Sequence, residues 1–220
     1  MSITGLCPII ILAYNNYSYV KNMVFNLERY VNINEIYIVD NCSTYPKLLE
    51  YYSIFKNLIR LDKNYGPHGA IAQIRSRLPS IYIITDPDLE INPKLPKDFI
   101  QQLIKISDTY KARKVGFALD ISQPEKFQET GKTFKGIPYP YEWEKQFWLN
   151  KIPNPNYELY NAEIDTTFCL YSTKYPYGNI RVAGDFTCLH LPWYKSSTVS
   201  MTDEELDFYK KNNIGSTWFK

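Results

Sequence analysis

The sequence Ser80-Ile81-Tyr82-Ile83-Ile84-Thr85-Asp86-Pro87-Asp88-Leu89 decides the fold of this chain. Its apolar, β-branched first half lies between two prolines and predicts a buried strand. Asp86 and Asp88 follow where that strand leaves the sheet, and Pro87 restricts the turn between them. Ligands of α/β folds bind at this carboxyl edge. Two carboxylates in this spacing suit a hard divalent cation that holds a diphosphate, and the alternative is a turn that only ends a strand.

Strand and helix patterns alternate through the first 120 residues. Strands are predicted at residues 8–14, 35–40, 58–61 and 115–120, and helices at 18–30 (with Ser18 as N-cap), 46–56, 70–78 and 97–110. This alternation implies right-handed crossovers and a mainly parallel sheet flanked by helices. The strands are nearly continuous apolar runs, which indicates that both faces of the sheet are covered.

The second half of the chain has a different pattern. Residues 121–160 combine prolines with aromatic residues, which predicts a loop-rich lobe with one short helix near 142–149. Strands are predicted again at 161–171 and 180–191. Thr202-Asp203-Glu204-Glu205 is a capping box that predicts a final helix.

Composition narrows the class of protein. The chain has 220 residues with a formal net charge of +2, and its basic residues are scattered, so no nucleic-acid partner is expected. The four cysteines lack metal-type or Cys-x-x-Cys spacing and indicate reduced thiols. Neither a secretory leader nor a membrane span is recognisable in the sequence. We therefore expect a cytoplasmic protein, with its oligomeric state open.

Polar residues follow each of the first four predicted strands. They are Tyr14-Asn15, Asp40-Asn41, Asn64-Tyr65-Gly66, and the acidic pair Asp86 and Asp88. Parallel strands bring such ends to one edge of the sheet, so together they predict a site large enough for a nucleotide.

In these segments the chain resembles the GT-A glycosyltransferases, specifically the family 2-like members. The resemblance is carried by Pro8…Ala13-Tyr14-Asn15, Ile38-Val39-Asp40-Asn41-Cys42-Ser43, Asn64-Tyr65-Gly66 and Thr85-Asp86-Pro87-Asp88, and it is firm over residues 7–120. It implies a GT-A, Rossmann-like α/β fold. Residues 1–120 would bind the nucleotide-sugar, 121–200 would form the acceptor-side lobe and complete the sheet, and 201–220 would form a C-terminal helix.

The resemblance also implies roles for individual residues. Asp40 would contact the base or ribose, and the backbone at Ala13 and Tyr14 would line the base. Asp86 and Asp88 would bind the ribose and a metal–diphosphate, with Mn²⁺ or Mg²⁺ as the cofactor. His190 occupies the place of a further metal ligand, although a strand-end core histidine is an alternative. The remaining donor-site candidates are Asn15, Asn64, Gly66 and His68, the last of which also fits a plain surface loop.

The catalytic base is less well defined by the sequence. Family 2 members often carry it in a Glu-Asp pair, which this chain lacks. Asp165, at the start of an apolar segment, is the first candidate for deprotonating an acceptor hydroxyl. Glu144, in the proline- and aromatic-rich lobe, is the second, and the neighbouring Glu142 is a further alternative.

The expected function is metal-dependent transfer of a sugar from a nucleotide-sugar to a glycan or other hydroxyl acceptor. A UDP-sugar is the first expectation for the donor, and inversion at the anomeric carbon is the expected stereochemistry. Two alternatives stay open. One is a sugar-phosphate nucleotidyltransferase, which shares the alternating architecture. The other is a non-catalytic nucleotide-sugar binder or partner subunit.

Overall fold

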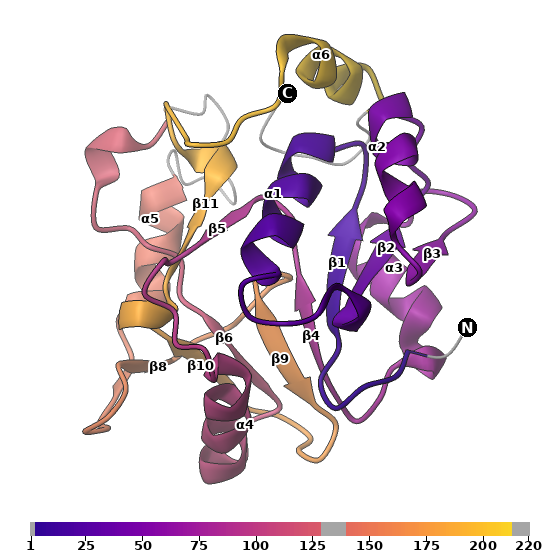
Figure 1. Cartoon of the computed structure of the whole chain (residues 1–220). Coiled ribbons are helices and arrows are strands. Elements are labelled where there is room, and N and C mark those ends of the chain that lie inside the picture. The colour runs from indigo at the N-terminus through magenta and orange to yellow at the C-terminus, as the bar shows by residue number, and fades with distance from the viewer. Residues whose placement is uncertain (1–2, 129–139, 213–220) are drawn as a thin grey trace.

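The computed structural model describes residues 3–128 and 140–212, and a large sheet forms its centre (Figure 1). The strands of this sheet lie in the order β3-β2-β1-β4-β9-β6-β10-β8-β7. Their bounds are β1 Ile9–Ala13, β2 Ile36–Asp40, β3 Leu58–Arg60, β4 Ile81–Thr85, β6 Lys114–Phe117, β7 Lys151–Ile152, β8 Leu159–Asn161, β9 Cys169–Ser172 and β10 Asn179–Val182.

All strands of the large sheet run in the same direction except β8 and β9. Parallel pairing joins β3, β2, β1 and β4, whereas β9 is antiparallel to both of its neighbours, β4 and β6. The expected mainly parallel α/β sheet is therefore confirmed. The carboxyl ends of β1, β2 and β4 meet at one edge, which lies at the top of Figure 1.

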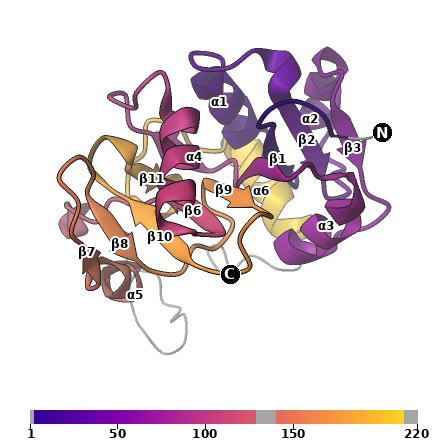
Figure 2. The same ribbon diagram turned by 90° about the horizontal axis from the view of Figure 1, so that it is seen from below.

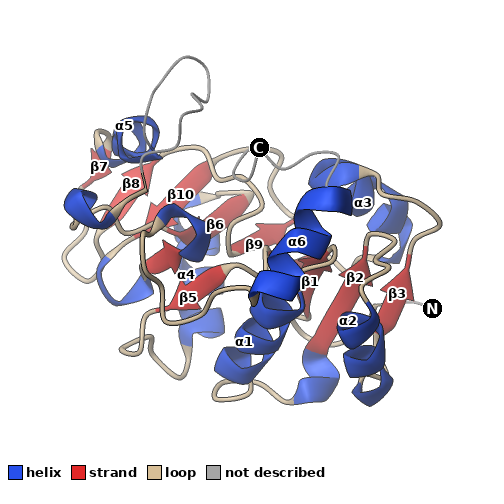
Figure 3. Ribbon diagram, turned by 90° about the horizontal axis from the view of Figure 1, so that it is seen from above, coloured by secondary structure: helices blue, strands red, loops and turns tan. Residues whose placement is uncertain are grey.

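Helices cover both faces of this sheet. Helices α1 (Tyr17–Leu27), α2 (Pro46–Tyr51) and α4 (Phe99–Tyr110) pack on one face, and α3 (Gly66–Ile74) packs on the other (Figure 3). The alternation of side chains along β1 explains this arrangement, because Ile9 and Ile11 belong to the first cluster and Ile10 and Leu12 to the second. Short α5 (Pro140–Glu144) adjoins the β7–β8 end, as the view from below shows (Figure 2).

A separate two-stranded ribbon follows the acidic pair. It consists of β5 (Leu89–Ile91) and β11 (Cys188–His190), which pair antiparallel with Leu89 opposite His190. The sequence does not predict β5, because three residues are too few to show a period. This ribbon brings residues about 100 positions apart in the chain to the same place.

Several predicted boundaries are wrong. The N-cap of α1 is Asn16 rather than Ser18, and α3 begins at Gly66, four residues before the predicted start. Pro67 explains the earlier start, because its fixed φ suits a first helical turn. The strand predicted at 161–171 is limited to β9 and the end of β8, since the residues between them cross the end of β4 instead.

The last helix, α6 (Asp203–Asn212), lies across the carboxyl edge (Figures 1 and 3). Thr202 Oγ1 accepts a hydrogen bond from Glu205 N at 3.2 Å, which confirms half of the predicted capping box. The Glu205 carboxylate also accepts from Ser18 N at the start of α1. The expected divisions at 120 and 200 remain a proposal, and residues 129–139 and 213–220 lie outside the described residues.

Candidate active site at the carboxyl edge

Asp86 is fixed at the end of β4 by one residue of the 161–168 segment. Its backbone N donates to Thr166 O at 3.0 Å, and its Oδ2 accepts from Thr166 Oγ1 at 2.7 Å. Thr166 is buried. These two bonds set the direction of the Asp86 carboxylate. The sequence does not predict this role, because no local pattern marks Thr166.

Asp88 and His190 lie side by side where the β5–β11 ribbon begins. The distance from His190 Nε2 to Asp88 Oδ2 is 3.6 Å, and Leu191 N donates to Asp88 O at 2.8 Å. The second carboxylate oxygen, Asp88 Oδ1, is buried and accepts no hydrogen bond from the described residues. Such an oxygen is costly to leave unpaired. A bound cation would satisfy it.

The protonation of this group follows from its burial. Burial, reinforced by the charge of Asp88, raises the pKa of Asp86 to about 7, and burial raises the pKa of Asp88 to about 6. Burial lowers the pKa of His190 to about 3, so its imidazole is neutral near pH 7 and able to ligate a metal. Raised carboxylate pKa values in such a place indicate a functional site.

The donor set fits a divalent cation that shares its ligands with a substrate. Within residues 3–128 and 140–212, no three His, Cys, Asp or Glu side chains form a group that could hold a metal ion by themselves. Mg²⁺ and similar ions in phosphate chemistry commonly take only one or two carboxylates, with substrate phosphates as further ligands. The unpaired oxygen of Asp88 and the neighbouring His190 suit that mode.

Asp165 is exposed and lies beside His68, from the first turn of α3. His68 Nε2 and Asp165 Oδ1 are 3.4 Å apart, and both side chains are more than two-thirds exposed. The charges of both residues act on the pKa of Asp86. The structure therefore places His68 and Asp165 close to Asp86, at the same edge of the sheet.

Glu144 is in a different environment. It is buried, and its carboxylate is bonded to the Arg181 guanidinium of β10, which also lies over the Phe147 ring. Burial raises the pKa of Glu144 to about 7, although Arg181 opposes the shift. A buried carboxylate held in this way has no open path to an acceptor hydroxyl, whereas Asp165 is exposed.

Asp40 requires a correction, because its carboxylate turns into the protein. The residue is fully buried, and its oxygens accept from Ser43 N (3.1 and 3.2 Å), Tyr52 Oη (3.0 Å) and Arg60 Nε (2.9 Å). These bonds tie the loop after β2 to α2 and β3. The carboxylate is not available to a base or ribose, and its role in this structure is to hold the loop.

Asp40→Asn is therefore expected to destabilise the protein by about 2 kcal/mol, because the amide NH₂ would face the groups that now donate to Oδ1 or Oδ2. Urea or thermal unfolding measures the effect, with Asp207→Asn on the exposed side of α6 as the control. Unchanged stability would mean that the Asp40 network is dispensable.

The other predicted donor-site residues divide into two groups. Asn15 is buried, and its Oδ1 accepts from Thr44 N (2.8 Å) and Tyr45 N (2.9 Å), so this oxygen holds the same loop. Its Nδ2 makes no hydrogen bond to the described residues, so a role of Asn15 in donor binding stays a prediction. Ala13 is also buried, with its carbonyl accepting from Asn41 N. Asn64 and Gly66 are partly exposed at the start of α3, where Asn64 Oδ1 accepts from Gly66 N at 2.9 Å.

Tyr14 connects this edge to the C-terminal helix. Its hydroxyl donates to Asn212 O at 2.7 Å, at the end of α6. Near the other end of α6, the Glu205 carboxylate binds Ser18. Helix α6 therefore covers the carboxyl edge next to Tyr14. The sequence did not indicate this contact.

The fold and the acidic edge together define a GT-A, Rossmann-like architecture. The family model for glycosyl transferase family 2 matches residues 9–168. The chain therefore belongs to glycosyl transferase family 2, as the resemblance implied. Among curated protein sequences, no match was found.

One solved structure with a similar fold covers most of this chain. A mannosyltransferase from Pyrobaculum calidifontis, in complex with GDP-Man and Mn²⁺, aligns with a TM-score of 0.50 and 13% identity over 93% of this chain and 60% of its own. The chain thus spans about 60% of that protein's length. Glucosyl-3-phosphoglycerate synthase from Mycobacterium tuberculosis, in complex with phosphoglyceric acid, is a weaker likeness, with a TM-score of 0.43 and 12% identity over 76% of this chain and 57% of its own. CMP:2-keto-3-deoxy-manno-octonic acid synthetase complexed with CTP is another, with a TM-score of 0.43 and 13% identity over 77% of this chain and 75% of its own.

Proposed function

We propose that this chain transfers a sugar from a nucleotide-sugar to a hydroxyl acceptor, with a divalent cation, Mn²⁺ or Mg²⁺, between the protein and the diphosphate. The observation that carries the proposal is the meeting of Asp86, Asp88 and His190 at the carboxyl edge, with one buried carboxylate oxygen left unpaired. The cation, when bound, supplies charge stabilisation for the departing nucleoside diphosphate.

Each part of the site has a separate task in this proposal. Asp86, aligned by Thr166, and Asp88 bind the cation, and His190 supports them as a neutral ligand. The partly exposed start of α3, with Asn64, Gly66 and His68, faces the donor. Tyr14, beside α6, borders the nucleotide.

The reaction then needs one base. Asp165 takes the proton of the acceptor hydroxyl while that oxygen forms a bond to the anomeric carbon, and the bond from this carbon to the diphosphate oxygen breaks. His68, 3.4 Å away, holds the Asp165 carboxylate in place. Attack from the face opposite the leaving group gives inversion.

A cavity of about 270 Å³ beside the β5–β11 ribbon is our candidate for the acceptor. Most of its walls, including Leu191 and Tyr194, come from the proposed acceptor-side region, and Glu90 and Asp120 from the nucleotide-sugar half complete them. Leu191 is also the residue whose N–H bonds to Asp88 O. This shared residue supports an acceptor close to the metal ligands.

Calorimetric titration with UDP, GDP, dTDP and CDP, each with and without Mn²⁺, tests the proposal. We expect one nucleotide to bind only when Mn²⁺ is present; UDP is the first expectation, and the GDP-Man of the mannosyltransferase makes GDP the second. Turnover of the matching nucleotide-sugar then separates an enzyme from a non-catalytic binder. Pyrophosphate release from a nucleoside triphosphate and a sugar phosphate would instead identify a nucleotidyltransferase. Failure of all four nucleotides to bind would exclude the transferase.

Binding of Mn²⁺ with the nucleotide is expected to strengthen as pH rises from about 5 to 8. The cation needs the ionised carboxylates, and the pKa values of Asp86 and Asp88 lie at about 7 and about 6. His190 contributes no change in this window, because its pKa is about 3. Titrations at four pH values measure the trend, and a flat profile would show that these two acids do not bind the ion.

The reducing compartment is also part of the proposal. All four cysteines carry free thiols, and Cys7, Cys169 and Cys188 are buried, which supports the cytoplasm. In the described parts of the chain, no helix combines the length and apolar character needed to cross a bilayer.

A further inference from the structure

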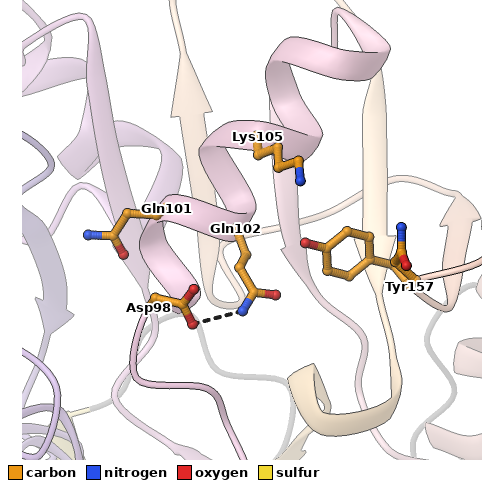
Figure 4. Close-up of a pocket in the computed structure, with 6 residues that line it drawn as sticks. Asp98, Gln101, Gln102, Lys105 and Tyr157 are labelled. Carbon is orange, nitrogen blue, oxygen red and sulfur yellow. Dashed lines mark hydrogen bonds between the residues drawn. The ribbon is translucent and has the colours of Figure 1, made fainter.

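A second pocket lies far from the carboxyl edge, between α4 and the turn that joins β7 to β8. It has a volume of about 450 Å³ and is lined by Asp98, Gln101, Gln102, Lys105, Asn156 and Tyr157 (Figure 4). In Figure 1, α4 lies at the opposite end of the molecule from α6. The pocket is an open hollow of the surface rather than an enclosed cavity.

The helical side of this pocket comes from one face of α4. Residues 98, 101, 102 and 105 are spaced three or four apart, and the opposite face of α4 packs into the core through Phe99, Leu103 and Ile106. Asp98 is the N-cap residue, yet its side chain makes no cap hydrogen bond. Its carboxylate accepts from Gln102 Nε2 at 2.8 Å, so it is turned along the pocket (Figure 4).

The opposite side of the pocket is held rigidly by Asn154. The Asn154 Oδ1 accepts from Asn156 N (2.8 Å) and Tyr157 N (2.9 Å), and its Nδ2 donates to Tyr110 Oη (2.9 Å) at the end of α4. The Tyr157 ring packs edge-on against Phe186, and its hydroxyl points toward α4 (Figure 4). The turn and the helix are thus joined before any ligand binds.

The chemistry of the lining selects a class of ligand. Amide side chains such as Gln102 and Asn156 both donate and accept, which matches sugar hydroxyls. The flat ring of Tyr157 suits the apolar face of a sugar. The charges of Lys105 and Asp98 cancel. Asp98 lies at the amino end of α4, where the helix dipole would otherwise attract a phosphate, and its negative charge repels one there.

We propose that this pocket binds one or two rings of a neutral oligosaccharide, apart from the transfer reaction. Such a site would hold a length of glycan at the end of the protein remote from Asp86 and Asp88. The proposal does not depend on the donor chemistry, because its ligand and its residues are separate from those of the carboxyl edge.

Saturation-transfer NMR on the full chain without nucleotide tests it, with maltotriose, mannotriose, N,N′,N″-triacetylchitotriose and, as a charged comparison, trigalacturonate. We expect at least one neutral trisaccharide to receive saturation and trigalacturonate to receive none. The signal should disappear in Tyr157→Ala and fall at least several-fold in Asn156→Ala, an exposed position whose change leaves the core intact.

Matched controls separate this site from others. Tyr177→Ala removes an exposed tyrosine outside the pocket and should keep the signal. Asp88→Asn, which alters the carboxyl edge, should keep it as well. Absence of saturation for all three neutral sugars overturns the proposal. So does a signal that survives in both Tyr157→Ala and Asn156→Ala, or one lost in Asp88→Asn, which would assign the sugar to the carboxyl edge. None of these results bears on metal-dependent nucleotide binding, so the proposed transferase can fail or stand separately.

Discussion

Asp88→Asn is expected to abolish Mn²⁺-dependent nucleotide binding and to lower sugar transfer by at least about 10²-fold. Asp88 contributes the one carboxylate oxygen in this group that is buried and unpaired, and it lies 3.6 Å from His190. The amide keeps the shape but removes the charge that would hold a cation against the diphosphate. Calorimetry with the bound nucleotide, with and without Mn²⁺, measures the loss directly.

The same substitution should stabilise the metal-free protein at pH 8. The pKa of Asp88 in the fold, about 6, is above its unfolded value near 4, so the folded state binds more protons in between. The protonated Asp88 carboxyl therefore contributes fully to the free energy of unfolding below about pH 4, and this contribution is lost as pH rises through about 6. The amide side chain of the variant has no charge to bury, so it does not suffer this loss.

Thermal unfolding at pH 5 and pH 8 without metal tests this sign, with the exposed Asp185→Asn as the control. Asp88→Asn should unfold at a higher temperature than the wild type at pH 8, and the difference should shrink at pH 5. A variant that lost stability at pH 8 while keeping metal-dependent binding would contradict both the burial of charge and the metal role of Asp88.

The strands that build the edge were predictable because their sequences allow one interpretation. Strands β1, β2 and β4 are apolar runs that end in polar residues. Because both faces of the sheet are covered, these runs are apolar throughout and show no alternation that could be mistaken for another element. Their carboxyl ends therefore identified where the site would lie. The family 2 resemblance rested on those same ends.

What the sequence could not predict depends on side-chain direction and distant pairing. Asp40 ends β2 as expected, but whether its carboxylate faces solvent or Arg60 is decided by β3, 20 residues later. The β5–β11 ribbon joins residues about 100 positions apart, so the contact between Asp88 and His190 has no local signal. Thr166 was missed for the same reason.

Asp165→Asn is expected to lower turnover by about 10²–10⁴-fold while nucleotide and Mn²⁺ binding stay unchanged, as removal of a general base predicts. Asp165 is the exposed carboxylate beside His68, and its neighbour Thr166 holds Asp86. An acceptor bound next to the donor can therefore meet it. The buried ion pair of Glu144 with Arg181 offers no such access.

Comparison with substitutions of two glutamates makes this prediction specific to Asp165. Glu163→Gln changes an exposed carboxylate two residues away and should keep full turnover. Glu144→Gln should lower the free energy of unfolding, because it leaves Arg181 buried without its charged partner, but should keep the turnover of the protein that remains folded. If Asp165→Asn kept full turnover and Glu144→Gln lost it with the fold intact, the base would be Glu144. The Glu144 carboxylate would then have to move away from Arg181 when the acceptor binds.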